Sequence, residues 1–122
     1  MTKKTVMVAE DDEAILEAMQ LMLEDDGYEV MPIADPTKVQ EMQGKLPDLL
    51  LLDIWMAGRD GTSICKQLKS QPTTRTLPII LCSANYDTAQ IAKECGADDS
   101  IAKPFDIAEL LTKVNKYVHW RD

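Results

Sequence analysis

Four consecutive leucines, Leu49 to Leu52, are followed directly by Asp53. The run is too short for a helix, which favours a buried strand. Because it is apolar on both faces, such a strand suits the centre of a parallel sheet that is covered on both sides. An aspartate next to it is costly unless its carboxylate has a partner. Both the fold and the chemistry are therefore expected to centre on this segment.

Four other short apolar runs are also expected to form strands, and segments with helical spacing lie between them. The predicted strands span Thr5–Ala9, Tyr28–Ile33, Leu77–Cys82 and Ser100–Ala102. Helices are expected around the stripe Ile15, Met19, Met22 and Leu23 that ends at Gly27, from Pro36 to Met42, between Gly61 and Ser70, and over Thr88–Cys95. A last helix begins with Asp106 as its cap and Glu109 three residues later, and its stripe is Ile107, Leu110, Leu111, Val114 and Val118.

A strand followed by a helix, repeated five times, predicts a parallel sheet with helices on both faces. The length of 122 residues fits one domain, and no linker or internal repeat divides the chain. We therefore expect a single α/β domain over residues 1–122, with three layers in the order α/β/α.

The composition argues against several classes of function. The chain has 21 acidic and 13 basic residues, a net charge of −8, so direct binding to nucleic acid or to an anionic membrane is not expected. Three cysteines outside any C-x-x-C pair and one histidine offer little for a zinc site. There is no signal peptide and no apolar stretch long enough to span a bilayer, which predicts a cytoplasmic protein.

The residues that follow the predicted strands carry the candidate chemistry. Open α/β sheets place their sites at the carboxyl ends of the strands. The residues at those positions are Glu10, Asp11 and Asp12 after the first strand, Asp53 after the third, Ser83 after the fourth and Lys103 after the fifth. Singly, each has an ordinary structural interpretation: Asp11 or Asp12 as a helix cap, Asp53 as a turn residue, Lys103 as a surface lysine. Together they predict a site.

Carboxylates gathered at one sheet edge require a cation or a proton. Two negative charges about 4 Å apart repel by roughly 4 kcal/mol at an effective dielectric of 20. Hard oxygen ligands without histidine or cysteine indicate Mg²⁺, with Ca²⁺ as the second choice. Lys103 would add a positive charge for a phosphoryl oxygen, and Ser83 a hydroxyl group.

Five ordered motifs resemble those of the receiver domains of two-component response regulators, and the resemblance covers essentially the whole chain. The motifs are Val6 to Asp12, Leu49 to Met56 with Gly58 and Asp60-Gly61, Pro78 to Ala84, Gly96 to Asp99, and Lys103-Pro104-Phe105. The resemblance implies a sheet in the order 2-1-3-4-5, as in the stand-alone chemotaxis regulator. It also implies a cis Lys103–Pro104 bond.

The resemblance implies a role for each site residue. Asp53 would accept a phosphoryl group from a histidine kinase or a histidine phosphotransfer protein. Glu10, Asp11, Asp53 and the backbone carbonyl of Trp55 would hold Mg²⁺, and Ser83 and Lys103 would bind the phosphoryl oxygens. Asp11-Asp12 is an alternative register for the acidic pair, but Glu10 follows the strand directly and is preferred. The switch would act on an unnamed downstream protein, with the chain a monomer or a phosphorylation-dependent dimer.

Two positions depart from the family pattern. The aromatic residue usual three positions before the lysine is replaced by Ser100, and the proline usual in the loop after the acceptor is replaced by Ala57. The first departure predicts a weak output response, or a response through other residues such as Ile101 or Tyr86. The second predicts a more mobile loop.

Other functions of the same fold fit the sequence less well. A dehalogenase-type phosphatase needs a second aspartate where Trp55 stands, and a P-loop enzyme needs a G-x-x-x-x-G-K motif that the chain lacks. The acidic loop after the first strand would repel the phosphate of a flavin. We therefore expect a signalling domain with no turnover of an external substrate. A receiver-like scaffold that binds partners without phosphorylation is the alternative.

Overall fold

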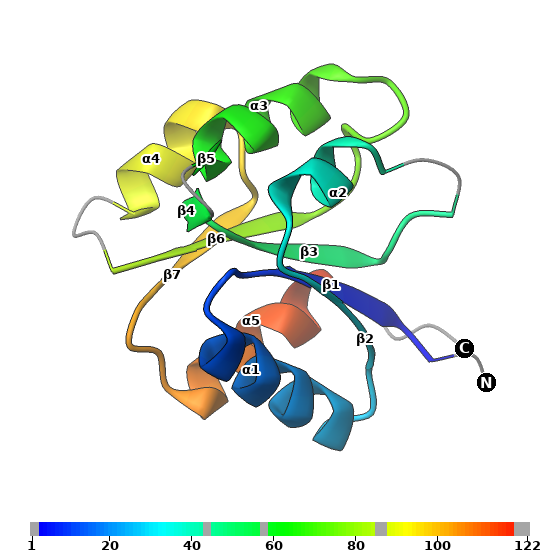
Figure 1. Ribbon diagram of the computed structural model, residues 1–122, viewed down its shortest axis with the longest axis vertical. Helices are drawn as coiled ribbons and strands as arrows, with labels where there is room; N and C mark the ends of the chain where they lie inside the picture. The colour runs from blue at the N-terminus through cyan, green and yellow to red at the C-terminus, as the bar shows by residue number, and fades with distance from the viewer. Residues whose placement is uncertain (1–2, 43–44, 57–58, 85–87, 119–122) are drawn as a thin grey trace.

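The computed structural model describes residues 3–42, 45–56, 59–84 and 88–118. Five parallel strands form one sheet in the order β2-β1-β3-β6-β7 (Figure 1). They are β1 (Thr5–Ala9), β2 (Glu29–Ile33), β3 (Leu49–Asp53), β6 (Ile79–Ser83) and β7 (Asp99–Ala102). Counted as the five strands of this sheet, the order is 2-1-3-4-5, so the predicted topology is confirmed.

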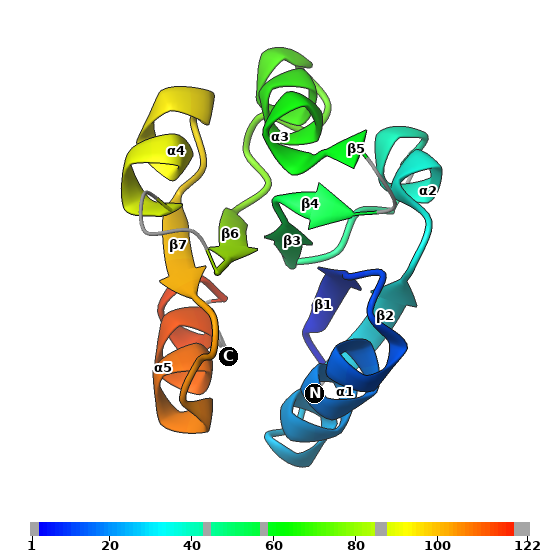
Figure 2. The same cartoon turned by 60° about the vertical axis from the view of Figure 1, so that its left-hand side comes forward.

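In the part of the chain that the structure describes, five helices cover the two faces of the sheet. They are α1 (Glu13–Asp25), α2 (Pro36–Gln40), α3 (Gly61–Ser70), α4 (Thr88–Cys95) and α5 (Ile107–Tyr117). Helices α1 and α5 lie on one face, and α2, α3 and α4 lie on the other (Figure 2). The predicted three layers are therefore present, and the element boundaries differ from the predicted ones by one or two residues at most ends.

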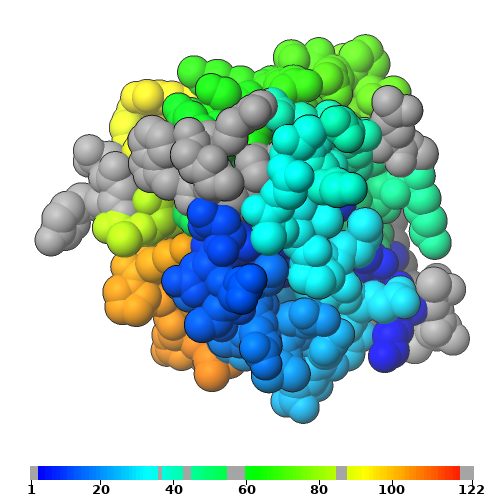
Figure 3. All heavy atoms as spheres, in the orientation of Figure 1, coloured from blue at the N-terminus to red at the C-terminus, as the bar shows by residue number. Residues whose placement is uncertain are grey.

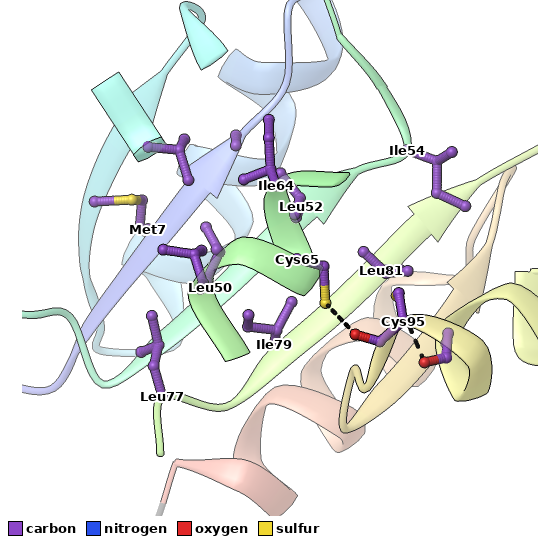
Figure 4. Close-up of a cluster of buried hydrophobic side chains, with 14 residues drawn as sticks. Met7, Leu50, Leu52, Ile54, Ile64, Cys65, Leu77, Ile79, Leu81 and Cys95 are labelled. Carbon is purple, nitrogen blue, oxygen red and sulfur yellow. Dashed lines mark hydrogen bonds between the residues drawn. The ribbon is translucent and has the colours of Figure 1, made fainter. Parts of the chain in front are cut away.

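The leucine run divides its side chains between the two faces, as a central strand requires. Leu50 and Leu52 pack with residues of α3 and α4 in the cluster shown in Figure 4. Leu49 and Leu51 pack with residues of α1 and α5 on the opposite face. All four side chains are buried. The sheet is thus a rigid platform whose carboxyl edge carries the polar residues.

Aspartates start four of the helices and fix where the chain leaves the sheet. The Oδ1 of Asp106 accepts a hydrogen bond from Ala108 N at 3.0 Å, and that of Asp60 accepts one from Thr62 N at 2.8 Å. Asp12 and Asp35 cap α1 and α2 in the same way. Side-chain acceptors at these positions satisfy N–H groups that the first turn leaves free. The cap at Asp106 agrees with the sequence prediction.

One feature of the fold was not predicted. Two strands of two residues each, β4 (Trp55–Met56) and β5 (Arg59–Asp60), pair antiparallel between β3 and α3. This short ribbon follows Asp53 directly and lies beside the carboxyl edge of the sheet (Figure 2). The loop after β3 is therefore partly ordered by backbone pairing. Ala57 lies outside the described residues.

Candidate functional site

Strand register brings the predicted site residues to one edge of the sheet. Ala9 is opposite Leu52, so Glu10 and Asp53 extend from neighbouring strand ends. Ser83 ends β6 opposite Ala102, and the N–H group of Lys103 donates to the carbonyl of Ser83 at 2.8 Å. The Lys103–Pro104 peptide bond is cis, as the resemblance implies.

Three carboxylates form a compact acidic group. One oxygen each from Glu10, Asp11 and Asp53 lies within 4.8 Å of the others. Glu10 is only 3% exposed, Asp53 is half-buried and Asp11 is exposed, so the group opens to solvent on one side. Such spacing suits a cation that retains some of its water. The chemical roles of these residues remain predictions.

Lys103 neutralises part of this negative charge. Its ammonium group donates to Oε1 of Glu10 and lies 3.5 Å from Oδ2 of Asp53. Burial alone would lower the pKa of Lys103, but the hydrogen bond to Glu10 and the charge of Asp53 outweigh it and raise the pKa. Lys103 is therefore a fixed positive charge next to the acidic group.

The carboxyl group of Asp53 is easier to protonate than an ordinary aspartate. Burial raises its pKa to about 6, and the negative charge of Glu10 adds to this effect. The positive charge of Lys103 acts in the opposite direction and is the largest opposing cause. Among the described residues, the site without a cation thus holds more negative charge than Lys103 balances.

Asp12 has a structural role that separates it from the acidic group. Its side chain caps α1 by accepting hydrogen bonds from Ala14 N at 3.0 Å and Ile15 N at 3.2 Å. Its own N–H group donates to Oε2 of Glu10 at 3.2 Å. The helix-cap interpretation therefore holds for Asp12, and the geometry favours Glu10 and Asp11 as the acidic pair.

The other predicted site residues occupy the same edge. Ser83 is 6% exposed at the end of β6, and the next residue, Ala84, is exposed and small. Trp55 lies in β4, two residues beyond Asp53 and opposite Asp60. The role of its carbonyl remains a prediction. The closure of the ribbon was not predicted: the N–H group of Gly61 donates to the carbonyl of Ile54. The Asp60-Gly61 pair was the available signal.

Ser100 leaves space where the family usually has an aromatic ring. A hollow of about 400 Å³ lies between α4 and α5, and its lining comprises Ala84, Thr88, Ala89, Ser100, Ala102, Lys103, Glu109 and Lys113. Ile101, one of the two residues predicted to carry the response instead, is 2% exposed and packs beneath α5. The other, Tyr86, lies outside the described residues.

A comparison with known families decides the identity. The family model of the response regulator receiver domain matches residues 6–115. The chain belongs to this family. Receiver domains accept a phosphoryl group in two-component signalling, so the chain is a signalling domain of that kind.

Individual receivers agree with this assignment. The transcriptional regulatory protein CseB of Streptomyces coelicolor is 38% identical over 112 residues, which are 89% of this chain and 47% of that protein. The chain spans about half the length of CseB and of other curated relatives that it matches. What those whole proteins do therefore does not follow for this chain.

Solved receiver structures overlay on nearly the whole chain. A structure described as a response regulator from Chloroflexus aurantiacus has a TM-score of 0.89 and 32% identity, covering 96% of this chain and 98% of that one. The receiver domain of the sensor histidine kinase PA1611 from Pseudomonas aeruginosa has a TM-score of 0.86 and 27% identity over the same shares. That structure has a magnesium ion coordinated in its active-site cleft.

The helices of this receiver are short. Across the stretches of chain that the structure describes, none combines the length and apolar character needed to cross a bilayer.

Proposed function

We propose that Asp53 is the phosphoryl acceptor of this receiver and that Glu10, Asp11, Lys103 and Ser83 assist the transfer. The observation that supports this most directly is the convergence of three carboxylates and one ammonium group at the end of the central strand. Asp53 is the member that follows this strand, and its side chain is partly exposed whereas that of Glu10 is buried. An aspartate carboxylate is a competent covalent nucleophile for phosphoryl transfer.

The acidic group fits Mg²⁺ by the nature of its donor atoms. Glu10, Asp11 and Asp53 offer hard oxygen ligands within 4.8 Å of one another, and the carbonyl of Trp55 would be a fourth. When bound, Mg²⁺ supplies positive charge that offsets the repulsion between the carboxylates and the incoming phosphoryl oxygens. The magnesium ion in the PA1611 receiver is consistent with this proposal.

The transfer itself is a single displacement at phosphorus. An oxygen of the Asp53 carboxylate forms the new P–O bond, and the P–N bond of a phosphohistidine donor breaks, so the imidazole leaves and takes up a proton. Lys103 lies close enough to Asp53 to pair with a phosphoryl oxygen, and Ser83 ends β6, the strand beside that of Asp53. Positioning and charge neutralisation account for most of the catalysis in such transfers.

The donor is expected to be a helical protein that carries the phosphohistidine. A mostly apolar hollow of about 390 Å³ lies between α1 and the segment after β7, lined by Ile15, Ala18, Met19, Met22, Ala84, Lys103, Pro104 and Phe105. Figure 3 shows α1 in blue beside that segment in orange. Two large apolar side chains of α1 and α5, Leu21 and Ile107, are 60% and 53% exposed. An apolar helix face can pack there while its histidine reaches the site.

The cellular setting is also part of the proposal. Cys65, Cys82 and Cys95 are all buried free thiols, which supports a reducing compartment such as the cytoplasm. The net charge of −8 supports a protein partner for the output of this domain in preference to nucleic acid. Its regulation would then act through protein–protein contacts, as a monomer or a phosphorylation-dependent dimer.

Acetyl phosphate with Mg²⁺, read by intact mass, tests the proposal. We expect one added phosphoryl group that is lost on standing, no adduct for Asp53→Asn, and a normal adduct for the control Asp35→Asn, whose carboxylate caps α2. Absence of an adduct on the unmodified chain would favour a scaffold that binds without phosphorylation. Many turnovers on a generic phosphate ester would instead indicate an enzyme.

A further inference from the structure

We propose that Gly61 is a positioning residue for Asp53, because the close approach of its backbone holds the acceptor segment in place. The proposal rests on the function proposed above for Asp53. It concerns the junction between the end of β3 and the start of α3, eight positions apart in sequence. Asp60-Gly61 belongs to the receiver-like motifs, but the helical stripe of α3 gives no reason for a glycine there.

Local conformation does not explain the glycine. Gly61 is the first residue of α3, after the cap Asp60, and alanine is a better helix former than glycine. Among the described glycines, only Gly27 and Gly96 have a positive φ. Alanine could therefore adopt the backbone conformation of Gly61, and the reason for glycine must be steric.

The steric reason is contact with the backbone that carries the acceptor. A Cβ atom added at Gly61 would lie 2.9 Å from the Cα of Ile54 and 2.9 Å from its carbonyl oxygen, and it would also meet the carbonyl oxygen of Asp53. The N–H group of Gly61 donates to that same carbonyl of Ile54. Gly61 is also buried. The two backbone segments thus lie close enough for this hydrogen bond, and they leave no room for a side chain at position 61.

Neither partner at this junction can give way easily. The N–H group of Ile54 donates to Cys82 O at 3.0 Å, and Asp53 is in register with Cys82 across β3 and β6. On the other side, α3 is anchored by Ile64, Cys65 and Leu68, which are at most 1% exposed. Figure 4 shows Ile54 in the same buried cluster as Ile64 and Cys65. Close-packed cores of this kind transmit a displacement and do not absorb it.

A methyl group at position 61 would therefore move the Asp53–Ile54 segment. The carboxylate of Asp53 would shift relative to Glu10, Asp11 and Lys103, and so would the ribbon that begins with Trp55. Functional groups need to be held within about 0.5 Å, and a shift of 1 Å can reduce a rate by about 100-fold. We expect Gly61→Ala to weaken Mg²⁺ binding and phosphoryl acceptance by at least about tenfold.

Two control variants separate positioning from general loss of stability. Gly27→Ala introduces an alanine at a φ of +97° with nothing within 4 Å of its Cβ, at the far end of α1. Thr62→Ala removes one hydrogen bond at the start of α3, from its hydroxyl to Asp60, and adds no atom near Asp53. Both should lose stability and keep the Mg²⁺ affinity of the unmodified chain within about twofold.

The experiment is a Mg²⁺ titration and an acetyl phosphate time course on all four proteins. Amide NMR shifts of Asp53, Ile54 and Cys82 report the displacement directly. Weaker Mg²⁺ binding with shifted amides in folded Gly61→Ala alone supports the proposal. Unchanged affinity and unchanged shifts contradict it, as does a variant that is unfolded even at 10 °C, since loss of the fold is not displacement of Asp53. If the unmodified chain takes no phosphoryl group, the proposed function fails, while Mg²⁺ affinity and shifts still decide the role of Gly61.

Discussion

The ionised carboxylate of Asp53 lowers the stability of the folded state when no cation is bound. It is half-buried, it lies beside Glu10, and Lys103 is shared between the two carboxylates. Burial and the nearby charge of Glu10 disfavour the ionised carboxylate of Asp53. A cation or a positively charged donor bound at the site would offset this cost. A site of this type gains affinity for ligands at the expense of its own stability.

This cost predicts the effect of Asp53→Asn on the metal-free protein. The pKa of Asp53 is raised to about 6 from an ordinary 3.8, mainly by burial, so the folded state holds the proton more tightly than the unfolded state. Stability is therefore lost as the pH rises from about 4 to above 6. In EDTA at pH 7.5, we expect the variant to be more stable by about 1–2 kcal/mol, allowing for partial screening. Urea unfolding at pH 4.5 and pH 7.5 checks this, and a variant less stable than the parent at pH 7.5 would contradict it.

The pairing of Lys103 with Glu10 predicts a coupling that a double-mutant cycle can measure. Lys103→Met leaves Glu10 buried without its cation, and we expect a loss of about 2–3 kcal/mol in the free energy of unfolding. Lys103→Met combined with Glu10→Gln should recover part of that loss, because no buried charge is left unpaired. If the double variant is no more stable than the sum of the single changes predicts, the two side chains are not coupled.

At the scale of elements, the start of α1 separates two adjacent aspartates by function. Asp12→Ala removes the cap and should cost about 1 kcal/mol in unfolding free energy while leaving Mg²⁺ affinity within about twofold. Asp11→Asn should keep the stability and weaken Mg²⁺ binding by about tenfold or more. Thermal unfolding and Mg²⁺ titration on both variants test this. If Asp12→Ala weakens Mg²⁺ binding and Asp11→Asn does not, the alternative assignment of Asp11 and Asp12 as the Mg²⁺-binding pair would be favoured.

The elements also show what a sequence can and cannot predict. The leucine run and the helical stripes predicted the strands and helices, since periodicity is a local property, and the residues after each strand gave the candidate site. The strand order was implied only by the resemblance to receiver domains. The β4–β5 ribbon was not predicted, because a strand of two residues is too short to show a hydrophobic period. The bond between Lys103 and Glu10 joins positions 93 apart, and the contact of Gly61 with Ile54 depends on backbone distance. Such details require the packed structure.

For the whole molecule, the output depends on how a change of charge at Asp53 alters the outer face formed by α5. The N–H group of Lys103 connects to Ser83 at the end of β6, so both phosphoryl-binding candidates move with β6 and β7. Helix α5 is fastened to β7 by Asp99, which lies 3.4 Å from Lys113 Nζ and accepts a hydrogen bond from Tyr117 at 3.0 Å. With Ser100 in place of an aromatic ring, this fastening is expected to limit the response of α5.

Asp99→Asn should therefore loosen α5 and enlarge its response, while Lys113 and Tyr117 keep their hydrogen bonds to the carbonyls of Ser100 and Asp98. Burial alone would raise the pKa of Asp99, but hydrogen bonds from Ser100 N and Tyr117 and the charge of Lys113 lower it, so its stabilising effect is present at neutral pH and is lost on acidification below about 4. Amide shifts on adding Mg²⁺ and beryllofluoride, a phosphoryl mimic, measure the response. We expect small shifts in α5 of the unmodified chain and of the control Thr112→Ala, whose hydroxyl bonds only within α5, and larger ones in Asp99→Asn. Equal α5 shifts in all three proteins would show that the output takes another route, because the fastening would then not limit it.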